Sequence, residues 1–66
     1  MTTEELKNLA VSMAIEAEDQ ADEYESPYDS YSQNLCDTIT EKGGSHEEKD
    51  YALSVFTQKC KRLGLI

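Results

Sequence analysis

Residues 43–48, GGSHEE, decide how this chain divides into helices. Gly43 and Gly44 permit left-handed backbone geometry, so they stop a helix that reaches them from the N-terminal side. Ser45 and Glu48 have the spacing of a capping box, in which the hydroxyl and the carboxylate each satisfy a backbone amide that lacks a helical partner. The stretch therefore predicts that one helix ends near residue 42 and that another begins at residue 46.

The helix that follows this cap is predicted over residues 46–63. Its apolar side chains recur at three- and four-residue steps and form the widest apolar arc of the chain: Tyr51, Ala52, Leu53, Val55, Phe56, Cys60 and Leu63. Gly64 is the expected C-terminal cap, with Leu65 or Ile66 folding back as its hydrophobic contact. Three cations in the last turns complement the helix dipole, namely Lys59, Lys61 and Arg62.

The helix that precedes the two glycines is predicted over residues 27–42. Ser26 and Pro27 form its start, because serine is a favoured cap and proline is favoured at the first helical position. Its apolar stripe is narrow and contains two tyrosines: Tyr28, Tyr31, Leu35 and Ile39. The opposite side of this helix is mostly polar and uncharged.

A first helix is predicted over residues 3–25. Thr2 and Glu5 form a second capping box at its start. Its apolar stripe follows three- and four-residue steps: Leu6, Leu9, Ala10, Met13, Ala17, Ala21 and Tyr24. We place its end near Glu25, because Pro27 disfavours helical geometry at the residue before it.

These three helices predict an all-α protein, a small three-helix bundle with helices at about 3–25, 27–42 and 46–63. The whole of residues 1–66 forms a single helical domain, with no alternating strand pattern, repeat or linker. Whether the bundle is closed or is an open hairpin plus one helix stays open at this point. A chain this short buries little surface, so assembly with a second copy is also an open alternative.

Composition excludes several classes of function. The formal net charge of −8 argues against direct nucleic-acid binding and against binding to anionic membranes, because both need basic patches. No apolar run is long enough to span a bilayer, and no signal segment opens the chain, so we expect a soluble, cytoplasmic protein. Two cysteines, Cys36 and Cys60, are too few for a disulfide scaffold, and we expect free thiols.

Catalytic and metal sites lack support in the sequence. His46 is the single histidine, and no nucleophile stands beside a base that a third group could orient. Cys36, His46 and Cys60 lack the paired spacing of structural zinc sites, and no calcium-loop pattern is present. We therefore expect neither an enzyme nor a bound cofactor or metal ion.

Residues 16–31, EAEDQADEYESPYDSY, form the most unusual segment, since they hold seven carboxylates, three tyrosines and no basic residue. If residues 16–25 are helical, their carboxylates are spaced at about 2.5 Å along the axis. Duplex DNA carries one charge per roughly 1.7 Å. This similarity predicts a surface that imitates nucleic acid and binds a basic protein. The preferred partner is a nucleic-acid-handling enzyme or complex.

The predicted partner-binding set contains the carboxylates of this segment, its three tyrosines and two aliphatic residues of the first helix. Its members are Val11, Ile15, Glu16, Glu18, Asp19, Asp22, Glu23, Tyr24, Glu25, Tyr28, Asp29 and Tyr31. Tyrosine rings are frequent anchors of protein interfaces. Three alternatives remain open: the acidic face is simply solvated, the tyrosines belong to the core, and Val11 and Ile15 widen the apolar arc.

The chain also has two resemblances to known proteins. In size, charge and helix content the whole chain resembles small acidic inhibitors of bacteriophages, including anti-CRISPR and DNA-mimic proteins, which implies an anti-defence function. Residues 48–53, EKDYAL, after a glycine turn, are similar to the second helix of the hairpin domain in phage cyclic-nucleotide sponges. That resemblance covers about a third of the chain and implies capture of a signalling nucleotide, with four cations to meet phosphate: Lys49, Lys59, Lys61 and Arg62.

Overall fold

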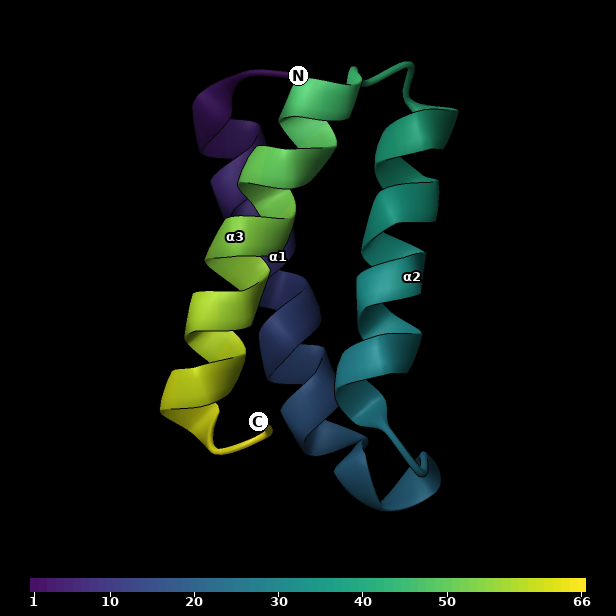
Figure 1. Ribbon diagram of the computed structural model, residues 1–66, viewed down its shortest axis with the longest axis vertical. Helices are drawn as coiled ribbons and strands as arrows, with labels where there is room; N and C mark the ends of the chain where they lie inside the picture. The colour runs from purple at the N-terminus through teal and green to yellow at the C-terminus, as the bar shows by residue number, and fades with distance from the viewer.

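The computed structural model describes residues 1–66 and contains three α-helices joined by short connections (Figure 1). Helix α1 spans Thr3–Asp19, α2 spans Pro27–Glu41 and α3 spans His46–Leu63. A short 3₁₀ turn, η1, spans Ala21–Glu23, and no residue lies in a strand. The predicted all-α three-helix bundle is confirmed.

The three helices form a closed bundle rather than an open hairpin. Because the chain reverses direction at each connection, α1 and α3 run the same way and α2 runs opposite to both (Figure 1). Each helix packs against the other two, and the α1–α3 contact is the most extensive. The molecule measures 31 × 20 × 14 Å along its principal axes.

Both predicted capping boxes are present, and they begin α1 and α3. The Thr2 hydroxyl accepts a hydrogen bond from the Glu5 amide at 3.1 Å, while the Glu5 carboxylate accepts one from the Thr2 amide at 3.0 Å. Ser45 and Glu48 make the equivalent pair at 3.2 and 2.8 Å. Each carboxylate therefore satisfies a backbone donor that the first helical turn leaves without a partner.

Helices α2 and α3 lie close to their predicted bounds. Helix α2 begins at Pro27 as expected, although the Ser26 side chain makes no capping hydrogen bond, and it ends one residue early, at Glu41. The Gly44 amide donates to the Ile39 carbonyl at 2.8 Å, which closes the helix end. Helix α3 spans the predicted residues 46–63, and Gly64 follows in the left-handed conformation with φ of 81°.

The prediction that the first helix reaches residue 25 is wrong, because α1 ends at Asp19. Gln20 leaves helical geometry, η1 follows, and Tyr24 is extended with φ of −129° and ψ of 144°. A helix that continued to residue 25 would project about 9 Å further, at 1.5 Å per residue, beyond the helices that cover α1. Its carboxylates would also lie at the negative end of the helix dipole, with no basic residue in the last turn.

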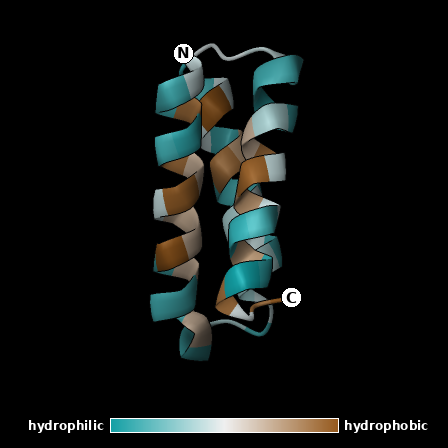
Figure 2. Cartoon of the chain, turned by 90° about the vertical axis from the view of Figure 1, so that its left-hand side faces the viewer, coloured by the Kyte–Doolittle hydropathy of each residue, from teal (hydrophilic) through white to brown (hydrophobic).

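The core lies along the shared axis of the three helices and contains ten buried side chains. Helix α1 contributes Leu6, Ala10, Ala14 and Ala17, α2 contributes Tyr31, Leu35 and Ile39, and α3 contributes Ala52, Phe56 and Cys60. Small alanine side chains on α1 let the larger Phe56, Leu35 and Ile39 fill the centre. Because the apolar residues recur at three- and four-residue steps, apolar and polar segments alternate along each helix (Figure 2).

Candidate protein-binding surface

Seven carboxylates gather at one end of the bundle, which we call the acidic end. They come from the last turn of α1, from η1 and its connection, and from the first turn of α2: Glu16, Glu18, Asp19, Asp22, Glu23, Glu25 and Asp29. All seven are exposed. The structure contains two ion pairs, and neither involves any of these residues. Their negative charge is therefore directed at solvent without a neutralising partner.

The acidic end differs from the continuous charged helix that the sequence predicted. Because α1 ends at Asp19, residues 16–25 occupy a helical turn, a 3₁₀ turn and an extended connection rather than one helix. The carboxylates therefore cluster around the end of the bundle instead of following a single axis. The regular linear spacing that we compared with duplex DNA is not formed.

The basic last turn of α3 lies at the same end of the molecule as the acidic end, because α1 and α3 run in parallel and finish together (Figure 1). Lys61 and Arg62 occupy this turn. No lysine or arginine nitrogen approaches a carboxylate oxygen within 4.0 Å. Charges of opposite sign that are far apart in the sequence thus lie at the same end of the bundle, although they do not pair.

The three tyrosines of the predicted binding set occupy very different environments. Tyr31 is 5% exposed and belongs to the core, where burial and then the neighbouring Tyr24 hydroxyl raise the pKa of its phenol. Tyr28 is half-buried, and its ring stacks on Phe56 with ring centres 5.6 Å apart. Tyr24 is 41% exposed and meets the Tyr31 ring edge to face, with centres 5.5 Å apart.

Tyr31 therefore belongs to the core and Tyr28 packs against it, as in the alternative in which the tyrosines are core residues. Tyr31 offers almost no surface to a partner, and Tyr28 directs its hydroxyl at Thr57 on α3. Of the three rings, Tyr24 alone is placed to contact another molecule over a large part of its surface. Its position beside Glu23 and Glu25 makes it part of the acidic end.

The two aliphatic members of the predicted set also separate. Ile15 is 45% exposed and lies in the last turns of α1, next to the first carboxylates of the acidic end. Val11 is half-buried one turn earlier and lines a hollow between α1 and α3. Val11 thus faces the hollow between α1 and α3 rather than the acidic end, whereas Ile15 is exposed beside the acidic end.

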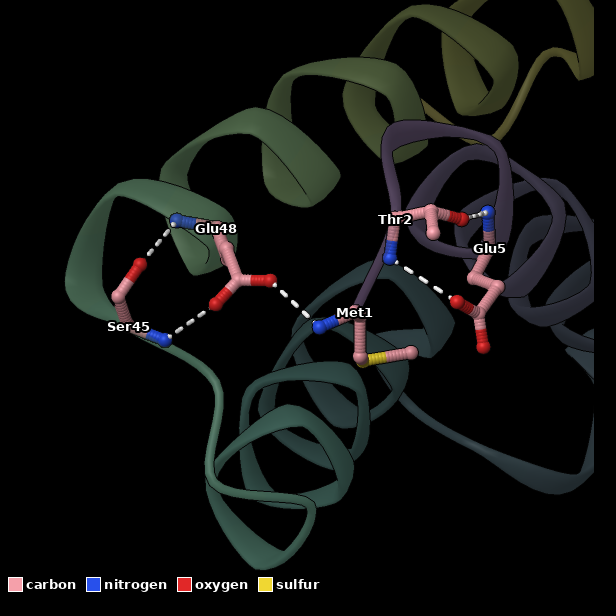
Figure 3. A network of polar contacts seen from close by, with 5 residues as sticks. All are labelled: Met1, Thr2, Glu5, Ser45 and Glu48. Carbon is pink, nitrogen blue, oxygen red and sulfur yellow. Dashed lines mark hydrogen bonds and ion pairs between the residues drawn. The ribbon is translucent and has the colours of Figure 1, made fainter.

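A polar network holds the opposite end of the bundle together (Figure 3). The Met1 ammonium lies 3.0 Å from the Glu48 carboxylate and joins the start of α1 to the start of α3. The hydrogen bond that the Ser45 amide donates to the Glu48 carboxylate, and then the Met1 ammonium, hold the pKa of Glu48 below its ordinary value. The Thr2 backbone and hydroxyl lower the pKa of Glu5 in the same way. These two carboxylates are engaged in helix capping, unlike those of the acidic end.

The structure brings together no group of three or more His, Cys, Asp or Glu side chains that could hold a metal ion. Both cysteines are free, with Cys60 buried and Cys36 half-buried. None of the three helices combines the length and the apolar character needed to cross a bilayer.

A shallow hollow of about 230 Å³ between α1 and α3 was not predicted from the sequence. Its basic members come from two helices, with Lys7 on α1 more than fifty residues before Lys59 and Arg62 on α3. The one available signal was the spacing of Lys7 with Val11 and of Tyr51 with Val55, which places each pair on one helical ridge. Nothing in that spacing says that the two ridges face each other.

Comparison with known protein families, with curated proteins and with solved structures finds no match to this chain. A functional assignment therefore depends on the geometry and charge described above.

Proposed function

We propose that this protein acts without catalysis, as an inhibitor that binds a basic protein partner through its acidic end. The observation that carries the proposal is the cluster of seven exposed carboxylates with no cation within ion-pair distance. Like charges held together repel each other, so the cluster costs folding free energy that a basic partner would return on binding. Charge-assisted hydrogen bonds from arginine and lysine are the strongest contacts such a surface can accept.

Two exposed apolar side chains, Ile15 and Tyr24, lie among these carboxylates and complete the proposed surface. Electrostatic attraction mainly speeds association and selects the partner, whereas buried aromatic and aliphatic anchors supply most of the affinity. A tyrosine ring at 41% exposure can be covered with little loss of side-chain freedom, because its edge already rests on Tyr31. The surface thus combines steering charge with an anchor.

The expected partner is an enzyme or complex that handles nucleic acid. Sites for the phosphate backbone are lined by lysine and arginine, and an acidic cluster competes for the same side chains. The inhibitor would occupy that site and exclude the nucleic acid. This is the function class implied by the likeness to small acidic phage inhibitors.

Charge reversal at the acidic end tests this proposal. The variant carries Asp19→Lys, Asp22→Lys and Glu23→Lys, and the matched control carries Asp37→Lys, Glu41→Lys and Asp50→Lys. Both change the net charge by the same amount, and all six positions are exposed. Each protein is immobilised, exposed to nuclease-treated bacterial lysate and eluted with rising salt, and the retained proteins are identified by mass spectrometry.

We expect the wild type and the control to retain the same basic protein and the acidic-end variant to lose it, with unchanged helicity by circular dichroism. Purified partner is then titrated with labelled oligonucleotide, which should compete with the inhibitor for one site. Equal retention by both variants would overturn the acidic end as the binding surface. Simultaneous binding of oligonucleotide and inhibitor would overturn nucleic-acid mimicry.

A further inference from the structure

A groove between α1 and α3 offers a second binding surface, distinct from the acidic end. Its lining comes from these two parallel helices alone, with Lys7 and Val11 on α1 and the remaining residues on α3. No residue of α2 borders it, so it lies on the side of the α1–α3 pair that α2 leaves open. A bundle with a fourth helix would fill this position.

Three cations surround this groove, namely Lys7, Lys59 and Arg62. They are half of the six lysine and arginine residues in a chain that carries fourteen carboxylates. None of the three has a carboxylate oxygen within 4.0 Å, and no carboxylate lines the groove. Unpaired cations that share one concave surface raise its positive potential, which favours an anion between them.

The remaining lining of the groove suits a flat organic group better than a bare anion. Val11 and Val55 provide half-buried apolar surface, and Tyr51 provides a ring that is 38% exposed. Aromatic rings of this kind stack on planar bases whatever the base identity. Gln58 adds an amide that can both donate and accept hydrogen bonds.

We propose that the α1–α3 groove binds an organic phosphate that carries a planar ring, of which a nucleotide is the commonest form. Lys7, Lys59 and Arg62 would meet the phosphate, while Tyr51 and the two valines would receive the ring. The hollow of about 230 Å³ is smaller than the roughly 300–1,000 Å³ of pockets for drug-sized ligands, so a mononucleotide would be only partly covered and a larger ligand even less so. This site uses none of the acidic-end residues and does not rest on the function proposed for them.

The first test is a titration of the isotope-labelled wild-type chain by heteronuclear NMR with adenosine monophosphate, adenosine and inorganic phosphate as separate probes. Adenosine monophosphate should give saturable shifts confined to amides near Lys7 and Val11 and along 51–62. Adenosine and phosphate should each bind at least roughly tenfold more weakly, because adenosine lacks the phosphate that the cations contact and phosphate lacks the ring that Tyr51 contacts. The affinity should fall as salt is added.

Two matched double variants distinguish binding in the groove from a general effect of the protein's positive charge. Lys59→Gln with Arg62→Gln removes two groove cations, whereas Lys49→Gln with Lys61→Gln removes two cations that do not line it. The first pair should weaken adenosine monophosphate by roughly tenfold or more, and the second should leave its affinity unchanged. Tyr51→Ala should weaken adenosine monophosphate and leave inorganic phosphate unaffected.

Three results would overturn the proposal. The first is the absence of saturable shifts with adenosine monophosphate at millimolar concentration. The second is an equal loss of affinity in both double variants. The third is a set of groove shifts that depend on protein concentration without any ligand, because a second copy of the chain would then occupy the groove. Each of these results leaves the acidic-end proposal unaffected, since that surface is tested by different residues.

Discussion

The Tyr28 and Thr57 side chains share a hydrogen bond of 2.9 Å between their hydroxyl oxygens, which joins α2 to α3. The same tyrosine stacks its ring on Phe56, at an interplanar angle of 25°. Tyr28 therefore fixes the position of α2 against α3 with both its ring and its polar group. The other two tyrosines of this region, Tyr31 on α2 and Tyr24 in the connection before it, contact each other instead.

Removal of this hydrogen bond should destabilise the bundle without disturbing its packing. Tyr28→Phe retains the ring stack and should lower the free energy of unfolding by about 0.5–1.5 kcal/mol, the usual net contribution of an intramolecular hydrogen bond. Urea denaturation followed by circular dichroism measures the change. In a double-mutant cycle with Thr57→Val, the two losses should be less than additive. Full additivity would show that the two hydroxyls are not coupled.

Gly43 and Gly44 should resist substitution for two different reasons. Gly43 has φ of 78°, and a Cβ added there would meet only open space, so Gly43→Ala introduces backbone strain of about 1–2 kcal/mol without a collision. A Cβ at Gly44 would collide with the Ile39 side chain and lie 3.0 Å from its carbonyl oxygen, and buried Ile39 has no room to move. We expect Gly44→Ala to cost about 1–3 kcal/mol through overpacking.

Asparagine distinguishes these two causes, because it tolerates left-handed geometry better than alanine does. Thermal unfolding should show that Gly43→Asn is more stable than Gly43→Ala. At position 44, asparagine should be no better than alanine, since the collision remains. Equal behaviour of asparagine at both positions would contradict the separate explanations.

The two free cysteines should differ in reactivity toward thiol reagents. Cys60 is buried in the core, and burial raises the pKa of its thiol, so little reactive thiolate forms at neutral pH. Cys36 is half-buried on α2 and should react first. Mass spectrometry after a short maleimide pulse should find one label, on Cys36, and two labels after unfolding in guanidinium. Early labelling of Cys60 would show that the core opens readily.

Acid should weaken the bundle partly through Glu48. The pKa of this carboxyl is lowered in the folded state from its ordinary value of 4.5, so its stabilisation is complete above that value and is lost as the pH falls through the lower folded-state pKa. Glu48→Gln keeps a capping side chain but no titrating charge. Its stability should therefore fall less steeply than that of the wild type below the ordinary carboxyl pKa.

Glu47→Gln is the matched control for this acid titration, because it removes the same charge one residue away without touching the capping box. Denaturant midpoints measured across the acid range should give this control the steep acid dependence of the wild type. Protonation of the acidic end affects all three proteins alike and cancels in the comparison. If Glu48→Gln is as acid-sensitive as the wild type, the cap contributes nothing through its charge.

Local signals in the sequence were sufficient to predict where α2 and α3 begin and end, to within a residue, and which of their side chains are apolar. Capping boxes, a proline at the first helical position and glycines with positive φ act within one turn of the residues that carry them. Periodicity then orients each side chain around its own helix, which is why Leu35, Ile39, Ala52 and Phe56 were identified as inward-facing. A pattern read over a few neighbouring residues can predict these features because the forces behind them act over the same few residues.

The packing of the three helices against one another sets where α1 ends, which tyrosines face solvent and which cations share a groove. Pro27 restricts the backbone of the residue before it. It therefore gives no information about how far the other two helices cover α1, which ends at Asp19. Periodicity places Tyr24 and Tyr31 alike on apolar helical stripes, yet Tyr31 is buried and Tyr24 is exposed. Periodicity states which way a side chain points around its helix, whereas contacts between segments distant in the chain determine what lies there to meet it.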